Sequence, residues 1–198
     1  AAYVSHGYGH ETIGHKPDIQ TMHMEVLRDF YNTYYWPNNA TLTIVGDIPL
    51  KDALKRVQTS FGRIPRSRTA IPQTQIIEPT QEGARSVEVA RESPINLYSA
   101  AYKAPNARSY DWAVLHVIAD YLTDGPQSAL DDALIDTHKA SSVDYSLYPT
   151  YDDGLFSINA QITSTASHAE VEEIILMHID RLKEKPVDTK RLSTIKTK

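Results

Sequence analysis

Several features are missing from this chain, and each absence excludes a class of function. The chain has no cysteine, which excludes disulfides, thiol nucleophiles and cysteine zinc sites and leaves the compartment open. Positive charge is not in excess, because the formal net charge is −5. We therefore expect neither nucleic acid nor an anionic membrane surface as a partner. No apolar run approaches the roughly 18 residues that cross a bilayer.

The common catalytic motifs are also missing. There is no glycine-rich phosphate loop, no G-x-S-x-G elbow and no Walker motif. A zinc peptidase helix needs H-E-x-x-H or the inverse H-x-x-E-H, so that two imidazoles share one helical face beside a general base. Between His6 and His10, glycine stands where the inverse motif needs glutamate. After His10-Glu11, three residues precede His15, whereas the forward motif allows two. We therefore interpret these as loop histidines and predict no metal ligand and no catalytic residue in the chain.

What the chain does contain is an α+β pattern organised around the stretch from Tyr34 to Asp47. Apolar residues three or four apart predict a helix over about 19–35, which Pro37 cannot continue. The apolar, β-branched run over 40–45 predicts a short buried strand. A second amphipathic helix is predicted over about 50–61.

A proline-punctuated polar stretch divides the chain. We predict a linker over residues 65–84 and a second unit from residue 85. That unit is predicted to contain four strands and three helices. The strands are expected over about 86–91, 95–102, 142–148 and 155–162, and the helices over about 112–122, 128–138 and 167–182. Ser109 and Ser167 have the positions of helix N-caps, and Glu170 completes a capping-box spacing.

The ends of the chain suggest a fragment. Residue 1 is Ala rather than Met, and the first residues lack the basic head and apolar run of a signal peptide. The pattern of one more helix begins near Val187 and reaches Lys198 without a stop signal.

Several motifs resemble the pitrilysin/insulinase family of zinc metallopeptidases, which includes the mitochondrial processing peptidases. The resemblance spans essentially the whole chain. Its motifs are His6-Gly7-Tyr8-Gly9-His10, Leu27-Arg28-Asp29-Phe30-Tyr31, Pro37-Asn38-Asn39-Ala40, Ile44-Val45-Gly46-Asp47, Phe61-Gly62-Arg63-Ile64-Pro65 and Tyr151-Asp152-Asp153-Gly154. The catalytic members are inverzincins, and the family's H-x-x-E-H helix would lie upstream of this chain.

The resemblance implies a domain plan. Residues 1–64 would be the back half of the zinc-bearing domain, and residues 85–198 an inactive second domain truncated at its C-terminus. Both would be β-sheets covered by helices, as two homologous units in one half of a clamshell around a peptide chamber. Zinc would belong to the parent protein, and this chain would bind none natively.

The resemblance also implies a missing pair. Many family members carry an Arg and a Tyr that help to hold the substrate, and an ungapped match places Ile135 and Ser142 there. Tyr145 is close but out of register. In relatives built from two chains, one chain supplies zinc and the other supplies this pair. The absence therefore favours a parent with its own zinc site and a separate partner, although an inactive member would lack the pair too.

Three functions follow as hypotheses. The first is the non-catalytic region of a zinc-dependent metalloendopeptidase that hydrolyses peptides in an enclosed chamber. The second is an inactive partner or assembly subunit of the same family, and the third is an unrelated α+β binding module. Expected partners are a peptide or unfolded protein, the upstream half of the first domain, and a second family subunit or a second copy. The resemblance favours the bacterial periplasm over the cytoplasm.

Overall fold

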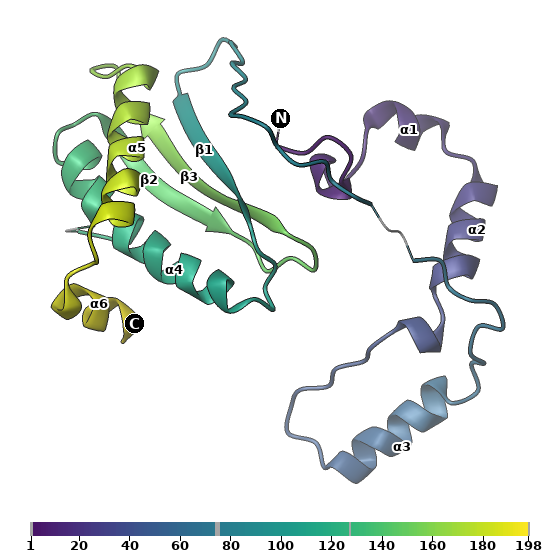
Figure 1. Ribbon diagram of the computed structural model, residues 1–198. Coiled ribbons are helices and arrows are strands. Elements are labelled where there is room, and N and C mark those ends of the chain that lie inside the picture. Colours follow the sequence, from purple (N-terminus) through teal and green to yellow (C-terminus); the bar gives the residue numbers. More distant parts are fainter. Residues whose placement is uncertain (1, 74–75, 127, 198) are drawn as a thin grey trace. The chain divides into compact units, whose positions relative to one another are not determined.

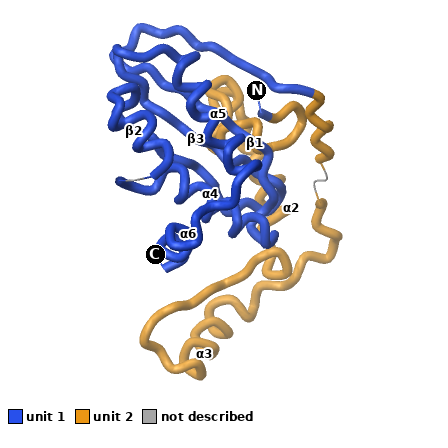
Figure 2. Tube along the Cα trace, turned by 60° about the vertical axis from the view of Figure 1, so that its left-hand side comes forward, with its two compact units in different colours: residues 1–2, 83–198 blue, residues 3–82 orange. Residues whose placement is uncertain are grey.

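The computed structural model describes residues 2–73, 76–126 and 128–197, and it shows an α+β chain. The chain divides into two compact units, which Figure 2 distinguishes by colour. In chain order, the first unit comprises residues 3–82 and is orange in Figure 2. The second unit comprises residues 83–198 together with residues 1–2 and is blue.

The first unit consists of helices joined by extended chain. Its helices are the 3-10 turns η1 (Gly7–Gly9) and η2 (Pro37–Asn39) and the α-helices α1 (Lys16–Thr21), α2 (Met24–Tyr34) and α3 (Leu50–Phe61). The helix predicted over 19–35 is therefore two helices. Met22, between them, has extended backbone (φ −65°, ψ 121°), and Pro17 starts α1 earlier than the periodicity indicated.

The strand predicted over 40–45 is wrong for this structure. Residues 40–45 have no strand assignment, and Val45 is 92% exposed. A strand is stabilised by a hydrogen-bonded neighbour, and no described segment of the first unit pairs with this one. The apolar, β-branched composition was recognised correctly, but composition alone supplies no partner.

The second unit is built on a three-stranded antiparallel sheet. Its strands are β1 (Asn96–Ala104), β2 (Ala140–Leu147) and β3 (Gly154–Ile162), in the order β1-β3-β2. β2 and β3 form a hairpin, and β1 pairs with β3 along its whole length. The segment predicted as a strand over 86–91 is extended chain without a ladder partner, and Val87 is 68% exposed.

Helices pack on one face of this sheet (Figure 1). They are α4 (Tyr110–Thr123), a one-turn π-helix η3 (Asp131–Ile135) and α5 (His168–Glu184), and α6 (Thr189–Lys196) packs against α4. The helix predicted over 128–138 is thus mostly this short π-turn. Leu122, Leu134, Ile158 and Ile175 are buried to 1% exposure or less and form the centre of the core.

Helix caps in the second unit follow the sequence. The Ser109 hydroxyl accepts a hydrogen bond from the Asp111 N–H. Ser167 and Glu170 form the predicted capping box, with each side chain accepting from the other residue's N–H. A 3.1 Å ion pair between Lys139 Nζ and Glu170 Oε1 joins the start of α5 to the segment before β2.

Candidate functional site

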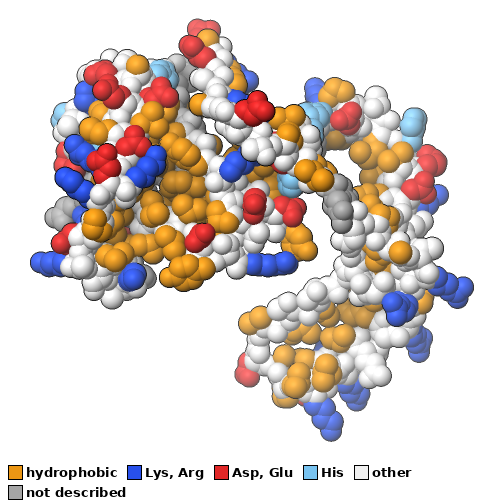
Figure 3. All heavy atoms as spheres, in the orientation of Figure 1, with side chains coloured by type: hydrophobic (Ala, Val, Ile, Leu, Met, Phe, Trp, Pro, Cys, Tyr) orange, Lys and Arg blue, Asp and Glu red, His pale blue; other side chains and the backbone are white. Residues whose placement is uncertain are grey.

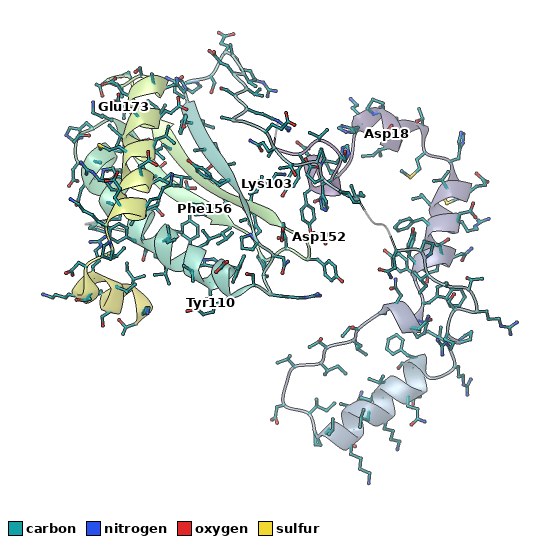
Figure 4. All side chains as sticks on the ribbon, in the orientation of Figure 1. Asp18, Lys103, Tyr110, Asp152, Phe156 and Glu173 are labelled. Atoms are coloured by element: carbon teal, nitrogen blue, oxygen red, sulfur yellow. The ribbon has the colours of Figure 1, made fainter. Side chains whose placement is uncertain are left out.

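The sheet of the second unit has one apolar face and one polar face. On β3 the even-numbered residues from 154 to 162 are buried, and the odd-numbered residues are half-buried. Phe156, labelled in Figure 4, belongs to the buried face, which forms one core cluster with α4 and α5. The opposite face carries mostly polar side chains and, among them, the apolar residues Leu97, Ala101 and Leu155. We name its polar part the open face and define it as Ser99, Lys103, Ser142, Asp144, Ser146, Ser157, Asn159 and Gln161.

A row of hydrogen bonds crosses the open face from one edge strand to the other. The Ser99 hydroxyl on β1 donates to Asn159 Oδ1 on β3 at 2.8 Å. Asn159 Nδ2 in turn donates to Asp144 Oδ1 on β2 at 2.9 Å and to Ser146 Oγ at 3.3 Å. These bonds fix the orientation of the Asn159 amide, because its oxygen faces a donor and its nitrogen faces acceptors. The open face is therefore an ordered polar surface.

The two positions at which the resemblance implies an Arg and a Tyr have different environments. Ile135 lies in η3 and packs against the hydrophobic core. Ser142 is exposed on the open face, paired with Gln161 beyond a β-bulge at the start of β2. A serine there can exchange hydrogen bonds with a ligand, whereas the half-buried Ile135 side chain offers only packing.

Tyr145 points to the other side of the sheet. Its hydroxyl donates to Asp120 Oδ1 at 3.2 Å and lies 3.2 Å from His116 Nδ1, so it is held against α4. Burial raises the pKa of the Tyr145 hydroxyl, and the charge and hydrogen bond of Asp120 raise it further. Tyr145 therefore lies on the helix-covered face of the sheet and contributes no group to the open face.

A second tyrosine with a shifted pKa lies between β1 and α5. Burial, together with the neighbouring Glu172 carboxylate, raises the pKa of Tyr98 to about 12. Tyr98 is on the helix-covered face, and its protonated hydroxyl is the form that the Glu172 carboxylate favours. This contact stabilises the packing of α5 on the sheet and involves no group of the open face.

The described histidines do not assemble a metal site. The His6 Nδ1 atom accepts a hydrogen bond from the Tyr8 N–H, and His10 and His15 face each other with ring centroids 5.8 Å apart. Among the described residues no group of three or more His, Asp or Glu side chains has the geometry to hold a metal ion. This donor set does not fit a catalytic zinc, which takes three protein ligands.

No helix within the described ranges is both long enough and apolar enough to span a membrane.

Sequence reasoning missed the open face as a site. The signal was present in the alternation of polar and apolar residues along 155–162, which predicts a strand with one polar face. That signal does not say which polar residues of other strands lie beside Asn159. The register of β1 and β2 decides this, and it pairs Ser99 and Asp144 with Asn159.

Comparisons with known proteins show which family this chain resembles. The family described as Peptidase M16 inactive domain matches residues 21–198. The zinc protease PqqE of Helicobacter pylori is 26% identical over 198 residues, which is 98% of this chain and 45% of that protein. The mitochondrial presequence protease of Schizosaccharomyces pombe is 25% identical over 199 residues, covering 95% of this chain and 20% of that protein.

A solved structure gives the same result for the fold. The crystal structure of a protease from Helicobacter pylori superposes with a TM-score of 0.92 at 26% identity, covering 99% of this chain and 48% of that one. The chain thus spans less than half the length of these relatives. The match removes the alternative of an unrelated α+β binding module. The chain belongs to the family of Peptidase M16 inactive domains.

Proposed function

We propose that the parent protein is a zinc-dependent metalloendopeptidase that hydrolyses peptides in an enclosed chamber, and that this chain contributes a non-catalytic part of the chamber wall. One observation carries the proposal. A sheet of the inactive-domain family presents an ordered polar face, while the described residues offer no set of zinc ligands. The chain alone is expected to cleave no peptide and to bind no zinc in a catalytic geometry.

The open face suits contact with many different peptides. A peptide backbone carries one donor and one acceptor at almost every residue, whatever its sequence. Ser99, Ser142, Ser146 and Ser157 carry hydroxyls that donate or accept by rotation, so they can match a backbone in more than one register. Water can take the same positions when no peptide is bound.

A second candidate function is that of an inactive partner or assembly subunit. It is consistent with the two positions that the resemblance assigns to an Arg and a Tyr, which are Ile135 and Ser142 here, because an inactive member would lack that pair as well. If the parent does hold zinc, the absence of the Arg and the Tyr favours a second family subunit, or a second copy of the chain, that supplies these two residues. The two cases differ in the parent's H-x-x-E-H motif, which is intact in the first and broken in the second.

The test compares the pure chain with its full-length parent. We expect the parent to cleave unstructured peptides, a chelator to abolish cleavage and added zinc to restore it. The pure chain should show no cleavage under the same conditions. Cleavage by the pure chain would refute the non-catalytic role, and a parent that neither binds zinc nor cleaves would favour the inactive partner. A periplasmic location remains a prediction that fractionation of cells would test.

A further inference from the structure

A carboxylate in the predicted linker is bound by three consecutive backbone N–H groups near the start of the first unit. Glu78 Oε1 accepts from the Val4 N–H at 2.8 Å, and Glu78 Oε2 accepts from the N–H groups of Ser5 and His6, both at 2.9 Å. These N–H groups precede the turn η1 and come from residues 72 to 74 positions away in the sequence.

The segment held in this way is compact and aromatic. We name residues 3–10 the aromatic loop. The rings of Tyr3, His6 and Tyr8 lie within 4.4 to 6.1 Å of one another, measured between centroids. Gly9 allows a close approach here, because a Cβ at that position would lie 3.2 Å from Tyr3 Cβ and would displace that side chain by a few tenths of an ångström. The loop therefore has a defined shape, and Tyr8 is 39% exposed at its surface.

The geometry favours carboxylate over any neutral side chain at residue 78. Three N–H donors converge on two oxygens, and a carboxylate offers acceptors only, so all three bonds are charge-assisted. A glutamine has one acceptor oxygen, and its NH₂ group would meet N–H donors. Pro79 follows Glu78 and disfavours helical backbone at residue 78, which favours the extended chain observed there.

We propose that Glu78 is a positioning residue that fixes the aromatic loop for contact with the peptide substrate. Of the three rings only that of Tyr8 is exposed, and the half-buried rings of Tyr3 and His6 support it. An exposed aromatic ring buries a large area against a partner, and a ring that is fixed in advance loses little further freedom on binding. Glu78 itself touches no substrate in this proposal. It acts through the backbone of residues 4–6, and the peptide-binding step rests on the peptidase function proposed above.

Hydrogen exchange of the full-length parent tests the contact without any assay of activity. In Glu78→Ala, the amides of residues 4–6 should exchange roughly ten to a hundred times faster than in the wild type. In the variant these N–H groups no longer donate to a carboxylate, so local opening of the loop costs less free energy. Sodium formate should restore part of the protection by placing a carboxylate among the three donors. The matched control is Glu82→Ala, an exposed acid of the same segment. Unchanged exchange in Glu78→Ala, or faster exchange that formate does not slow, would overturn the inference.

Peptide kinetics of the same variants test the role of the loop. We expect Glu78→Ala and Glu78→Gln to raise KM several-fold with kcat nearly unchanged, formate to lower KM again for Glu78→Ala, and Glu82→Ala to match the wild type. An unchanged KM in Glu78→Ala would overturn the role in substrate binding. A wild-type parent without peptidase activity would refute the proposed function instead, and the exchange experiment would still decide whether Glu78 holds the loop.

Discussion

The two units of this chain show how the same kind of hydrophobic pattern leads to different degrees of burial. In the second unit Ile158 is fully buried, because its strand has a neighbour on each side and helices pack over one face. In the first unit Leu42, Ile44 and Val45 are 50 to 92% exposed, and Ala53 is the only buried residue of α3. Figure 3 shows hydrophobic side chains open at the surface around α3.

The comparison shows that periodicity predicts which face an element would bury, whereas burial itself requires a second element. α3 is strongly amphipathic in sequence and still exposes Leu50 and Leu54. The solved relative that this chain resembles is about twice as long. We therefore propose that further polypeptide of the parent covers the apolar surface of the first unit.

Core truncation should give the largest difference between the units. Ile158→Ala removes packing from a fully buried site and should lower the free energy of unfolding of the second unit by about 2–5 kcal/mol. Leu54→Ala in α3, 59% exposed, should change stability by less than about 0.5 kcal/mol. Urea unfolding followed by Trp112 fluorescence, with Trp36 replaced by Phe, measures the effect of Ile158→Ala on the second unit. Trp36 fluorescence, with Trp112 replaced by Phe, measures the effect of Leu54→Ala on the first unit. Equal effects of the two variants would contradict the comparison.

Loss of the half-buried Tyr145 hydroxyl contact should have the next largest effect. Tyr145→Phe leaves Asp120 Oδ1 and His116 Nδ1 without their tyrosine partner and should cost about 1–3 kcal/mol. Tyr148→Phe is the matched control, because Tyr148 is 72% exposed. The same unfolding experiment checks both variants. An effect of Tyr145→Phe no larger than that of the control would show that the contact is not formed in solution.

The capping box of α5 should contribute about 0.5–2 kcal/mol to the stability of the second unit. Ser167→Ala removes the hydroxyl that accepts from the Glu170 N–H. Ser164→Ala, an exposed serine just before the helix, serves as the control. Circular dichroism during thermal unfolding should show a lower Tm for Ser167→Ala alone, and equal values for the two variants would argue against the cap.

The smallest expected effect is on pH dependence. The hydrogen bond from the Ser167 backbone, and then that from Lys139, lower the pKa of Glu170 below its ordinary value of 4.5. A lowered pKa in the folded state contributes stability above the unfolded-state pKa, and this stability is lost as pH falls through the folded-state pKa. Stability of the wild type should therefore fall more steeply below pH 4.5 than that of Glu170→Gln. Glu173→Gln, on the exposed side of α5 (Figure 4), should retain the wild-type slope.

Much of the second unit could be predicted from the sequence, because its signals are local. The strands at 96–104, 140–147 and 154–162, the helix from 168 and the caps at Ser109 and Ser167 follow from alternation, helical spacing and cap chemistry. Which face β3 buries could also be predicted, because polar and apolar residues alternate along 156–162.

Features that depend on distant partners could not be predicted. The run 40–45 has the composition of a strand but no described neighbour, and the extent of the π-turn η3 depends on packing against β2. The polar row through Asn159 and the bonds from Glu78 to Val4, Ser5 and His6 join residues far apart in sequence. No short motif encodes such contacts.

One measurement tests the difference between the units most directly, namely amide hydrogen exchange of residues 42–45 and of residues 156–160 in the same sample of this chain. We predict exchange near the intrinsic rate for 42–45, because no strand partner protects these N–H groups. Amides of 156–160, in the central strand, should exchange only on global opening of the second unit and so orders of magnitude more slowly. Equal, strong protection of both segments would contradict the account, since it would mean that residues 42–45 lie in a paired strand.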